Sequence, residues 1–284
     1  MRIVHFEKAG VPGIAADEGS GWHGLTERES GFPGTLPELI AQGADLLRTG
    51  RDLLPMHAID LNAVRILPPV PKPPKILCVG LNYDDHLEES GLKKPVYPEI
   101  FGRFATSLIA HQEPIRRPRE STALDYEAEL AVVIGKPARG VSREDAYTCI
   151  AGYTVANDYA IRDYLENYYR PNLRVKSRDT CTPMGPWLVD AADVPAPMKL
   201  ALRTSVNGKV TQEGNTRDMI FDIPFLIEYL SGFMTLAPGD VILTGTPEGL
   251  VDVKPGDEVV TEIDGVGRLL NTIVGDEAFT PADR

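Results

Sequence analysis

Two glutamates, one residue apart, stand at the start of a segment whose composition is otherwise typical of a buried β-strand. Residues 125–135 read DYEAELAVVIG. Side chains alternate between the two faces of a strand, so Glu127 and Glu129 are predicted to share one face. Two like charges that are partly removed from water must be protonated, neutralised by cations or bound to a metal.

A third carboxylate, Asp158, ends a second apolar strand that is predicted over residues 151–158. Three carboxylates at the ends of neighbouring strands would form an all-oxygen site, which suits Mg²⁺ or Mn²⁺ and poorly suits zinc. The spacing alone leaves an alternative open, in which Glu127 and Glu129 lie on the solvent-exposed face of an edge strand.

A polar segment between Gly80 and Gly91 contains a histidine and several acids, and we interpret it as a candidate lid. If this segment is helical, His86 and Glu89 lie at positions i and i+3 on one face, where the carboxylate orients the imidazole and raises its basicity. Such a pair serves as a general base or proton shuttle. The alternative is a solvated surface helix that carries an incidental histidine.

Two cationic residues and one threonine are candidates for contacts with an anionic substrate. Arg162 and Lys176 offer a planar fork and a compact charge that bind carboxylates or an enolate oxygen. Each could equally be a salt-bridge partner for one of the 41 acidic residues. Residues 244–249, TGTPEG, lack the Gly-Lys-Ser/Thr ending of a nucleotide loop. They are predicted to form a tight turn that presents the Thr246 hydroxyl and backbone N–H groups to a carboxylate.

Composition limits the classes of partner. The chain has 284 residues, 43% of them hydrophobic, and a net charge of −12 without a basic cluster, which disfavours nucleic acids and anionic membranes. The first residues lack the apolar stretch of a signal peptide and no run is long enough to span a membrane, so a soluble cytoplasmic protein is expected. Three widely spaced cysteines argue against a disulfide framework and fit no zinc pattern.

A proline-rich segment, residues 67–74, reads as an extended linker between a small N-terminal α/β cap (1–70) and a catalytic domain (71–284). The cap is predicted to contain a strand over 2–6 and a helix over 36–49. Short β-branched runs in the larger part predict strands over 75–79, 130–134, 153–156, 200–206, 241–244 and 258–263, with helices over 142–149, 161–169 and 223–231. Strands this closely spaced indicate a β-rich α+β roll rather than a doubly wound sheet.

Together these motifs resemble the fumarylacetoacetate hydrolase superfamily over roughly residues 70 to 275. The matching elements are residues 80–83 (GLNY) with His86 and Glu89, residues 126–130 (YEAEL), Asn157-Asp158, residues 176–179 (KSRD) and residues 244–247 (TGTP). The resemblance implies a mixed β-sandwich roll and a Mg²⁺- or Mn²⁺-dependent homodimer. It also implies residue roles: Glu127, Glu129 and Asp158 as metal ligands, His86, Glu89 and Lys176 as catalytic residues, and Asn82, Tyr83, Arg162 and Thr246 in substrate binding.

Residues 157–179 are most similar to superfamily members that decarboxylate and isomerise 2-oxo or 2-hydroxy-dienoic di- and tricarboxylic acids in the breakdown of 4-hydroxyphenylacetate and homoprotocatechuate. The resemblance thus implies a small anionic keto-acid substrate. These members carry two catalytic repeats, whereas this chain carries one. Two alternatives remain: an acylpyruvate-type C–C hydrolase, and a binding protein that has lost catalysis. Many C–C-cleaving members have glutamine where this chain has Leu165, which favours the isomerase/decarboxylase.

Overall fold

The computed structural model describes residues 1–89, 91, 93–165 and 173–279. The strands are β1 (Arg2–Lys8), β2 (Val11–Asp17), β3 (His23–Thr26), β4 (His57–Ala58), β5 (Arg65–Ile66), β6 (Ile76–Gly80), β7 (Glu99–Arg103), β8 (Leu108–Ile109), β9 (Ile115–Arg117), β10 (Leu124–Asp125), β11 (Ala128–Ile134), β12 (Ile150–Asn157), β13 (Ala160–Ile161), β14 (Thr182–Asp190), β15 (Ala201–Val206), β16 (Lys209–Asn215), β17 (Val241–Leu243), β18 (Glu258–Ile263) and β19 (Gly267–Gly275). The α-helices are α1 (Leu36–Ala41), α2 (Leu46–Leu53), α3 (Asp84–Glu89), α4 (Leu173–Lys176) and α5 (Ile223–Phe233).

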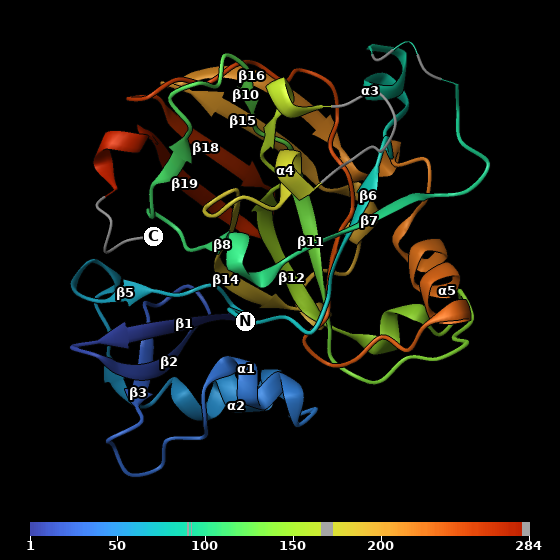
Figure 1. Ribbon diagram of the computed structural model, residues 1–284. Helices are drawn as coiled ribbons and strands as arrows, with labels where there is room; N and C mark the ends of the chain where they lie inside the picture. The colour runs from blue at the N-terminus through green and yellow to red at the C-terminus, as the bar shows by residue number, and fades with distance from the viewer. Residues whose placement is uncertain (90, 92, 166–172, 280–284) are drawn as a thin grey trace.

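Two β-sheets pack face to face. The larger has the order β4-β3-β2-β1-β14-β12-β11-β17-β6-β7, and the smaller has the order β16-β15-β18-β19-β9. Leu130 and Val132 of β11 share a core with Leu202, Ile263 and Leu269 of the smaller sheet, whose labelled strands lie at the upper left in Figure 1. The predicted β-rich α+β sandwich is therefore confirmed.

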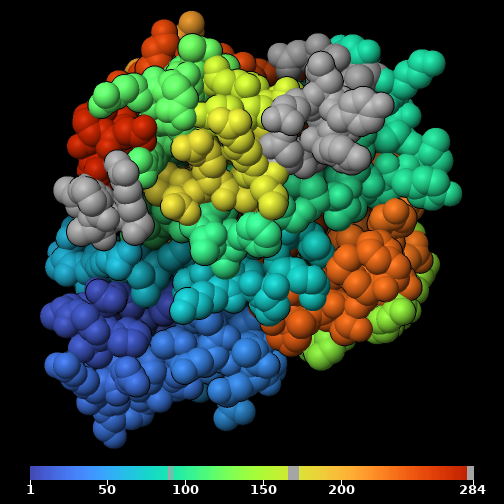
Figure 2. All heavy atoms as spheres, viewed as in Figure 1, coloured from blue at the N-terminus to red at the C-terminus, as the bar shows by residue number. Residues whose placement is uncertain are grey.

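The N-terminal strands belong to the larger sheet. β1 pairs with β14 through Arg2↔Val189 and Ile3↔Leu188, and Ile3 packs in the same apolar cluster as Val133. Figures 1 and 2 show residues 1–60, in blue, gathered at one end of the molecule against the remainder. One sheet and one core thus extend across the proline-rich segment, and the division into domains 1–70 and 71–284 stays a prediction.

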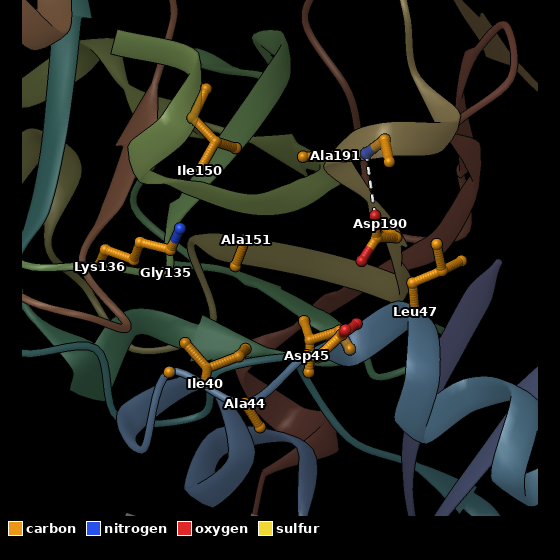
Figure 3. A pocket seen from close by; sticks show the side chains of 13 residues that line it. Ile40, Ala44, Asp45, Leu47, Gly135, Lys136, Ile150, Ala151, Asp190 and Ala191 are labelled. Carbon is orange, nitrogen blue, oxygen red and sulfur yellow. Dashed lines mark hydrogen bonds between the residues drawn. The ribbon is translucent and has the colours of Figure 1, made fainter. Parts of the chain in front are cut away.

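A cavity of about 300 Å³ lies where α1 and α2 meet the larger sheet. Figure 3 shows Ile40 and Asp45 on its helical side, and Gly135 and Ile150 on the side of β11 and β12. These are the ends of β11 and β12 that lie away from Glu127 and Asp158. The cavity is therefore separate from the acidic residues that the sequence singles out.

Three of the expected helices differ from those observed. The helix expected over 36–49 is two helices, because Gly43 adopts a left-handed φ of 66° and Asp45 caps a new helix by accepting a hydrogen bond from the Arg48 N–H. The stretch 142–149 holds only a 3₁₀ turn, Ala146–Cys149. The helix expected over 161–169 is wrong at its start, where Ile161 pairs with Leu124 before a 3₁₀ turn over Arg162–Tyr164; residues 166–169 lie outside the described part.

The helix expected over 223–231 is confirmed as α5. Asp222 caps it by accepting from the Phe225 N–H, and Pro224 occupies the first turn, where a missing N–H costs nothing. Among the described residues, no helix is both long and apolar enough to cross a membrane.

His111 is expected to make the fold less stable as the pH falls. Its Nδ1 accepts a hydrogen bond from the Leu270 N–H at 3.1 Å, and burial, assisted by Arg268, lowers the pKa of its imidazole from 6.5 to about 4. The unfolded chain therefore binds a proton that the folded chain does not, so stability falls from about pH 6.5 down to about pH 4.

The measurement is the free energy of unfolding by urea at pH 7 and pH 5, compared with His111→Asn. Asparagine keeps an acceptor for the Leu270 N–H and does not titrate. Between these pH values the wild type is expected to lose about 1–2 kcal/mol more than the variant, after allowance for solvent screening. Equal losses would contradict the assignment.

Candidate active site

Three carboxylates meet where β11 begins and β12 ends. The two strands are antiparallel, with Ala128 opposite Asn157, and the Asp158 N–H donates to the Glu127 carbonyl at 2.9 Å. One ligand oxygen from each of Glu127, Glu129 and Asp158 lies within 4.8 Å of the other two. The predicted juxtaposition is confirmed, while the role of these residues as metal ligands stays a prediction.

The alternative of an exposed edge strand is wrong. β11 lies between β12 and β17 in the larger sheet. Residue exposure is 8% at Glu127, 2% at Glu129 and 0% at Asp158. Carboxylates this deeply buried need compensating charge, because transfer from water disfavours the ionised form.

Within the described part of the chain, three cationic side chains contact the trio. Lys176 Nζ, from α4, lies 2.8 Å from Glu127 Oε2 and 2.9 Å from Asp158 Oδ2. Arg162 Nη2 donates to Glu127 Oε1 at 2.5 Å, and its Nε donates to Asp125 Oδ2 at 2.8 Å. Arg103, from β7, forms an ion pair with Asp158 and donates to the carbonyls of Tyr159 and Cys181.

The cluster is therefore unequally compensated. Burial would raise the pKa of the Glu127 carboxyl, but Lys176 and Arg162 lower it to about 2. Burial and the nearby Glu127 charge raise the pKa of Glu129 to about 8. Among the residues that the structure describes, four carboxylates, with Asp125 included, face three cations, so one negative charge is left over and Glu129 retains a proton at neutral pH. A divalent cation would take the place of that proton.

The donor set fits a divalent metal. Glu127, Glu129 and Asp158 would hold it through carboxylate oxygens, which are the ligands preferred by Mg²⁺ and Mn²⁺. The three ionised acids with Asp125, the three cations and a divalent ion together carry one net positive charge, which favours an anionic ligand. The cations that contact Glu127 and Asp158 also orient these two ligands.

The backbone at Gly245 supports Glu129. The Gly245 N–H donates to Glu129 Oε2 at 2.5 Å. Gly245 has a φ of 94°, and a Cβ there would lie 2.7 Å from the Cβ of Asn82, so only glycine fits without strain. Residues 244–249, which are predicted to form a tight turn, do present a backbone N–H to a carboxylate, although the observed carboxylate is the protein's own.

Asn82 and Tyr83, both expected to bind substrate, lie buried at the end of β6. The Asn82 amide donates to the carbonyls of Phe221 and Thr244 and accepts from the Phe221 N–H. This side chain therefore holds the turn in place, and a contact with substrate stays a prediction. The Tyr83 hydroxyl has no hydrogen-bond partner within the described part of the chain, and burial raises its pKa well above 10.

Residues 84–89 of the candidate lid form helix α3, which meets the condition set for the His86–Glu89 pair. α3 contains both His86 and Glu89, and His86 is close enough to the cluster to contribute to the lowered pKa of Glu127. The side chain of Glu89 lies outside the described part, so the His86–Glu89 pair stays a prediction. Thr246 is 3% exposed and accepts a hydrogen bond from Gln212.

Arg103, Asp125 and Gln212 belong to the site but were not among the residues predicted from the sequence. Arg103 is 4% exposed although it stands in a run of ordinary strand residues. A buried arginine requires a carboxylate partner, because an unpaired buried charge is costly. The burial of Arg103, however, is not visible in the sequence. Asp125 is paired through Arg162, and Gln212 comes from the smaller sheet, so only the fold brings them here.

Comparison with known proteins identifies the family. Residues 75–274 match the model of the fumarylacetoacetate (FAA) hydrolase C-terminal domain. The chain is 59% identical over 203 residues to the 4-hydroxyphenylacetate degradation bifunctional isomerase/decarboxylase of Salmonella dublin, which covers 72% of this chain and 47% of that protein. It therefore spans about half the length of such relatives.

Two further relatives match over nearly their full length. A mitochondrial oxaloacetate tautomerase of Xenopus laevis is 38% identical, over 96% of this chain and 90% of that protein. The crystal structure of maleylpyruvate hydrolase from Sphingobium sp. SYK-6, in complex with manganese(II) and pyruvate, superposes with a TM-score of 0.82 at 31% identity, over 97% of this chain and 99% of that one. Because the family model spans most of the chain and includes the acidic cluster, the chain belongs to the fumarylacetoacetate hydrolase family.

Proposed function

We propose that the protein is a divalent-metal-dependent enzyme that isomerises or decarboxylates 2-oxo or 2-hydroxy-dienoic di- and tricarboxylic acids in aromatic-compound catabolism. The observation that carries this proposal is the buried trio Glu127, Glu129 and Asp158, flanked by three cations with one negative charge left over. The Salmonella relative, named as an isomerase/decarboxylase, supports the substrate class. Mg²⁺ or Mn²⁺ is the proposed cofactor, and the manganese in the maleylpyruvate hydrolase structure supports that choice.

The bound cation would supply positive charge that stabilises negative charge developing on the 2-oxo oxygen. Around it, Arg162 and Thr246 would bind substrate carboxylates. Lys176 is buried, and burial, together with Arg162 and Arg103, lowers the pKa of its ammonium group against the opposing effect of Glu127. A lysine in such a setting gives up its proton more readily, which suits a residue that moves a proton along the conjugated acid.

A second candidate is the tautomerisation of oxaloacetate-like keto acids. It is favoured by the Xenopus tautomerase, which aligns with 96% of this chain. The two candidates share their central step, since a proton moves between carbon and oxygen of an enol–ketone pair in both. The same cluster would serve either reaction, and the distal part of the substrate would distinguish them.

The discriminating experiment incubates purified protein, with Mg²⁺ or Mn²⁺, with four compounds. These are 5-oxopent-3-ene-1,2,5-tricarboxylate, 2-hydroxyhepta-2,4-diene-1,7-dioate, enol-oxaloacetate and an acylpyruvate. CO₂ release from the first, or loss of dienol absorbance from the second, supports the isomerase/decarboxylase. Turnover of enol-oxaloacetate alone supports the second candidate. Cleavage of the acylpyruvate alone overturns both in favour of the hydrolase alternative, and no metal-dependent turnover overturns all three.

His86→Ala is expected to lower kcat about 10²-fold, the usual contribution of one positioned acid–base group. His86 lies near Glu127 and does not belong to the carboxylate trio, so the affinity for Mn²⁺ should stay within a factor of two or so of the wild-type value. Steady-state kinetics and Mn²⁺ titration monitored by electron paramagnetic resonance measure the two quantities. Unchanged turnover would remove His86 from the mechanism.

The proposal includes a homodimeric state, which the family resemblance implies, and a cytoplasmic location, which is the location expected from the sequence. Sedimentation velocity at micromolar concentration tests the first. A sedimentation coefficient that fits a 31.0 kDa monomer would contradict it.

A further inference from the structure

A row of buried polar side chains runs from the smaller sheet to Thr246. Thr204, Gln212 and Thr261 come from β15, β16 and β18, and each is at most 1% exposed. Gln212 Nε2 lies 2.8 Å from Thr246 Oγ1 and 2.8 Å from the carbonyl of Pro247. Gln212 Oε1 lies 3.1 Å from Thr204 Oγ1.

The direction of these hydrogen bonds follows from the chemistry of Pro247. A backbone carbonyl only accepts, so the group of Gln212 that faces it must be the amide nitrogen. The same nitrogen then donates to Thr246 Oγ1. The opposite orientation of the amide would place two oxygens 2.8 Å apart in a buried site, which is unfavourable.

The remainder of the row is consistent with this direction. Gln212 Oε1 must accept, so Thr204 donates to it and in turn accepts from Thr261 at 3.0 Å. Thr261 then accepts from the Asn157 amide nitrogen, also at 3.0 Å. The hydroxyl protons of Thr261 and Thr204 are therefore both donated to acceptors within the row.

Thr246 differs from these two threonines. Its oxygen accepts from Gln212, and within the described residues no group accepts its own proton. The preceding residue, Gly245, donates its N–H to Glu129. The turn therefore brings a backbone N–H and an uncommitted hydroxyl proton, on consecutive residues, to the region of the acidic cluster.

Hydrogen bonds and close packing fix the position of the Gln212 side chain. β16 lies close to Pro247: a Cβ built at Gly214 would lie only 2.6 Å from Pro247 Cγ. Only a residue without a side chain at position 214 allows Pro247 to approach β16 in this way. The Gln212 amide is thus held at both ends, and its donor group cannot turn away from Thr246 without losing the Pro247 bond.

We propose that Gln212 is a positioning residue that fixes the Thr246 hydroxyl as a hydrogen-bond donor to a carboxylate of the substrate. The inference rests on the proposed function, in which Thr246 contacts an anionic keto acid. It identifies the smaller sheet as a determinant of substrate affinity, although none of its strands carries a member of the carboxylate trio.

The test measures the affinity of the Mg²⁺-loaded protein for oxalate by calorimetry, which requires no turnover. Thr246→Val removes the donor and is expected to weaken oxalate binding about 10- to 100-fold, the usual effect of losing a hydrogen bond to a charged group. Gln212→Met removes the orienting amide and is expected to weaken it about 5- to 10-fold. Thr246→Ser, which keeps the hydroxyl, should bind nearly as tightly as the wild type.

The double variant Gln212→Met/Thr246→Val supplies the decisive comparison. If Gln212 acts through Thr246, the double variant binds oxalate no more weakly than Thr246→Val alone. Thr216→Val is the matched control, since Thr216 is buried, donates to the Pro197 carbonyl and accepts from the Leu200 N–H, away from the site. It should lower Tm and leave oxalate affinity and Mg²⁺ affinity unchanged.

Additive effects in the double variant, or a loss of oxalate affinity that follows Tm and includes Thr216→Val, would overturn the proposal. So would a wild-type protein that binds Mg²⁺ but not oxalate. A wild type that binds oxalate with this pattern of variants but turns over none of the four compounds would support the role of Gln212 while overturning the proposed function.

Discussion

Replacing Glu129 by glutamine is expected to abolish metal binding and turnover while leaving the fold of the metal-free protein nearly unchanged. Burial and Glu127 raise the pKa of Glu129 to about 8, so at pH 7 the metal-free side chain is mostly the neutral acid. Glutamine matches that neutral form in shape and still offers an oxygen to the Gly245 N–H. It does not supply the third anionic ligand that a divalent cation requires.

The measurement is Tm with and without 5 mM Mg²⁺ or Mn²⁺, together with turnover. A ligand that binds only the native state stabilises it according to its concentration over Kd, so the wild type should show a metal-dependent rise in Tm. Glu129→Gln should lack this rise, with a metal-free Tm close to that of the wild type.

Glu127→Gln provides the contrasting control. Lys176 and Arg162 keep Glu127 ionised against the effect of burial, and removal of its charge leaves the buried Lys176 and the partly exposed Arg162 without their shared partner. This variant should be destabilised by about 3 kcal/mol even without metal. An active Glu129→Gln enzyme, or equal metal-free stabilities for the two variants, would contradict the assignment of charges in the cluster.

The carboxylate trio could be predicted from the sequence because it depends on local rules. Alternation along a strand places Glu127 and Glu129 on one face, and the antiparallel pairing of β11 with β12 brings Asp158 beside them. Both strands are short apolar runs with polar ends, which is a strong pattern. The same rules predict the strand at 258–263, which is observed as β18.

The surroundings of the trio could not be predicted in the same way. Arg103 reaches Asp158 from β7, at the edge of the larger sheet, and Gln212 reaches Thr246 from the other sheet. Such contacts depend on sheet order and on the packing of two sheets, neither of which has a local signal. The helix predicted from the local sequence pattern is also wrong at Ile161, because strand pairing with Leu124 outweighs the helical preference.

Lys176→Met is expected to lower turnover about 10⁴-fold while making the response to metal larger than in the wild type. Lys176 Nζ is the one cation that contacts both Glu127 and Asp158 in the described cluster. Its loss removes the proposed proton carrier. It also leaves two buried carboxylates with less compensating charge, although Arg162 and Arg103 remain.

The metal-free variant should therefore be less stable than the wild type by about 3 kcal/mol, the usual cost of removing one partner from a buried ion pair. A divalent cation bound to the carboxylates replaces the missing charge, so saturating Mg²⁺ should recover most of that loss. Urea unfolding with and without Mg²⁺ measures the difference, and steady-state assays measure the loss of turnover.

Lys75→Met is the matched control for this prediction. Lys75 Nζ lies 2.6 Å from Asp240 Oδ2, and Asp240 is fully buried, but neither residue belongs to the carboxylate trio or to the cations around it. Its replacement should destabilise the protein by a similar mechanism, with no recovery by Mg²⁺ and with turnover retained. If Mg²⁺ stabilises Lys176→Met no more than it stabilises the wild type, the lysine does not share its carboxylates with a metal. A Lys176→Met enzyme of normal activity would exclude the lysine from proton transfer, because methionine cannot carry a proton at any accessible pH.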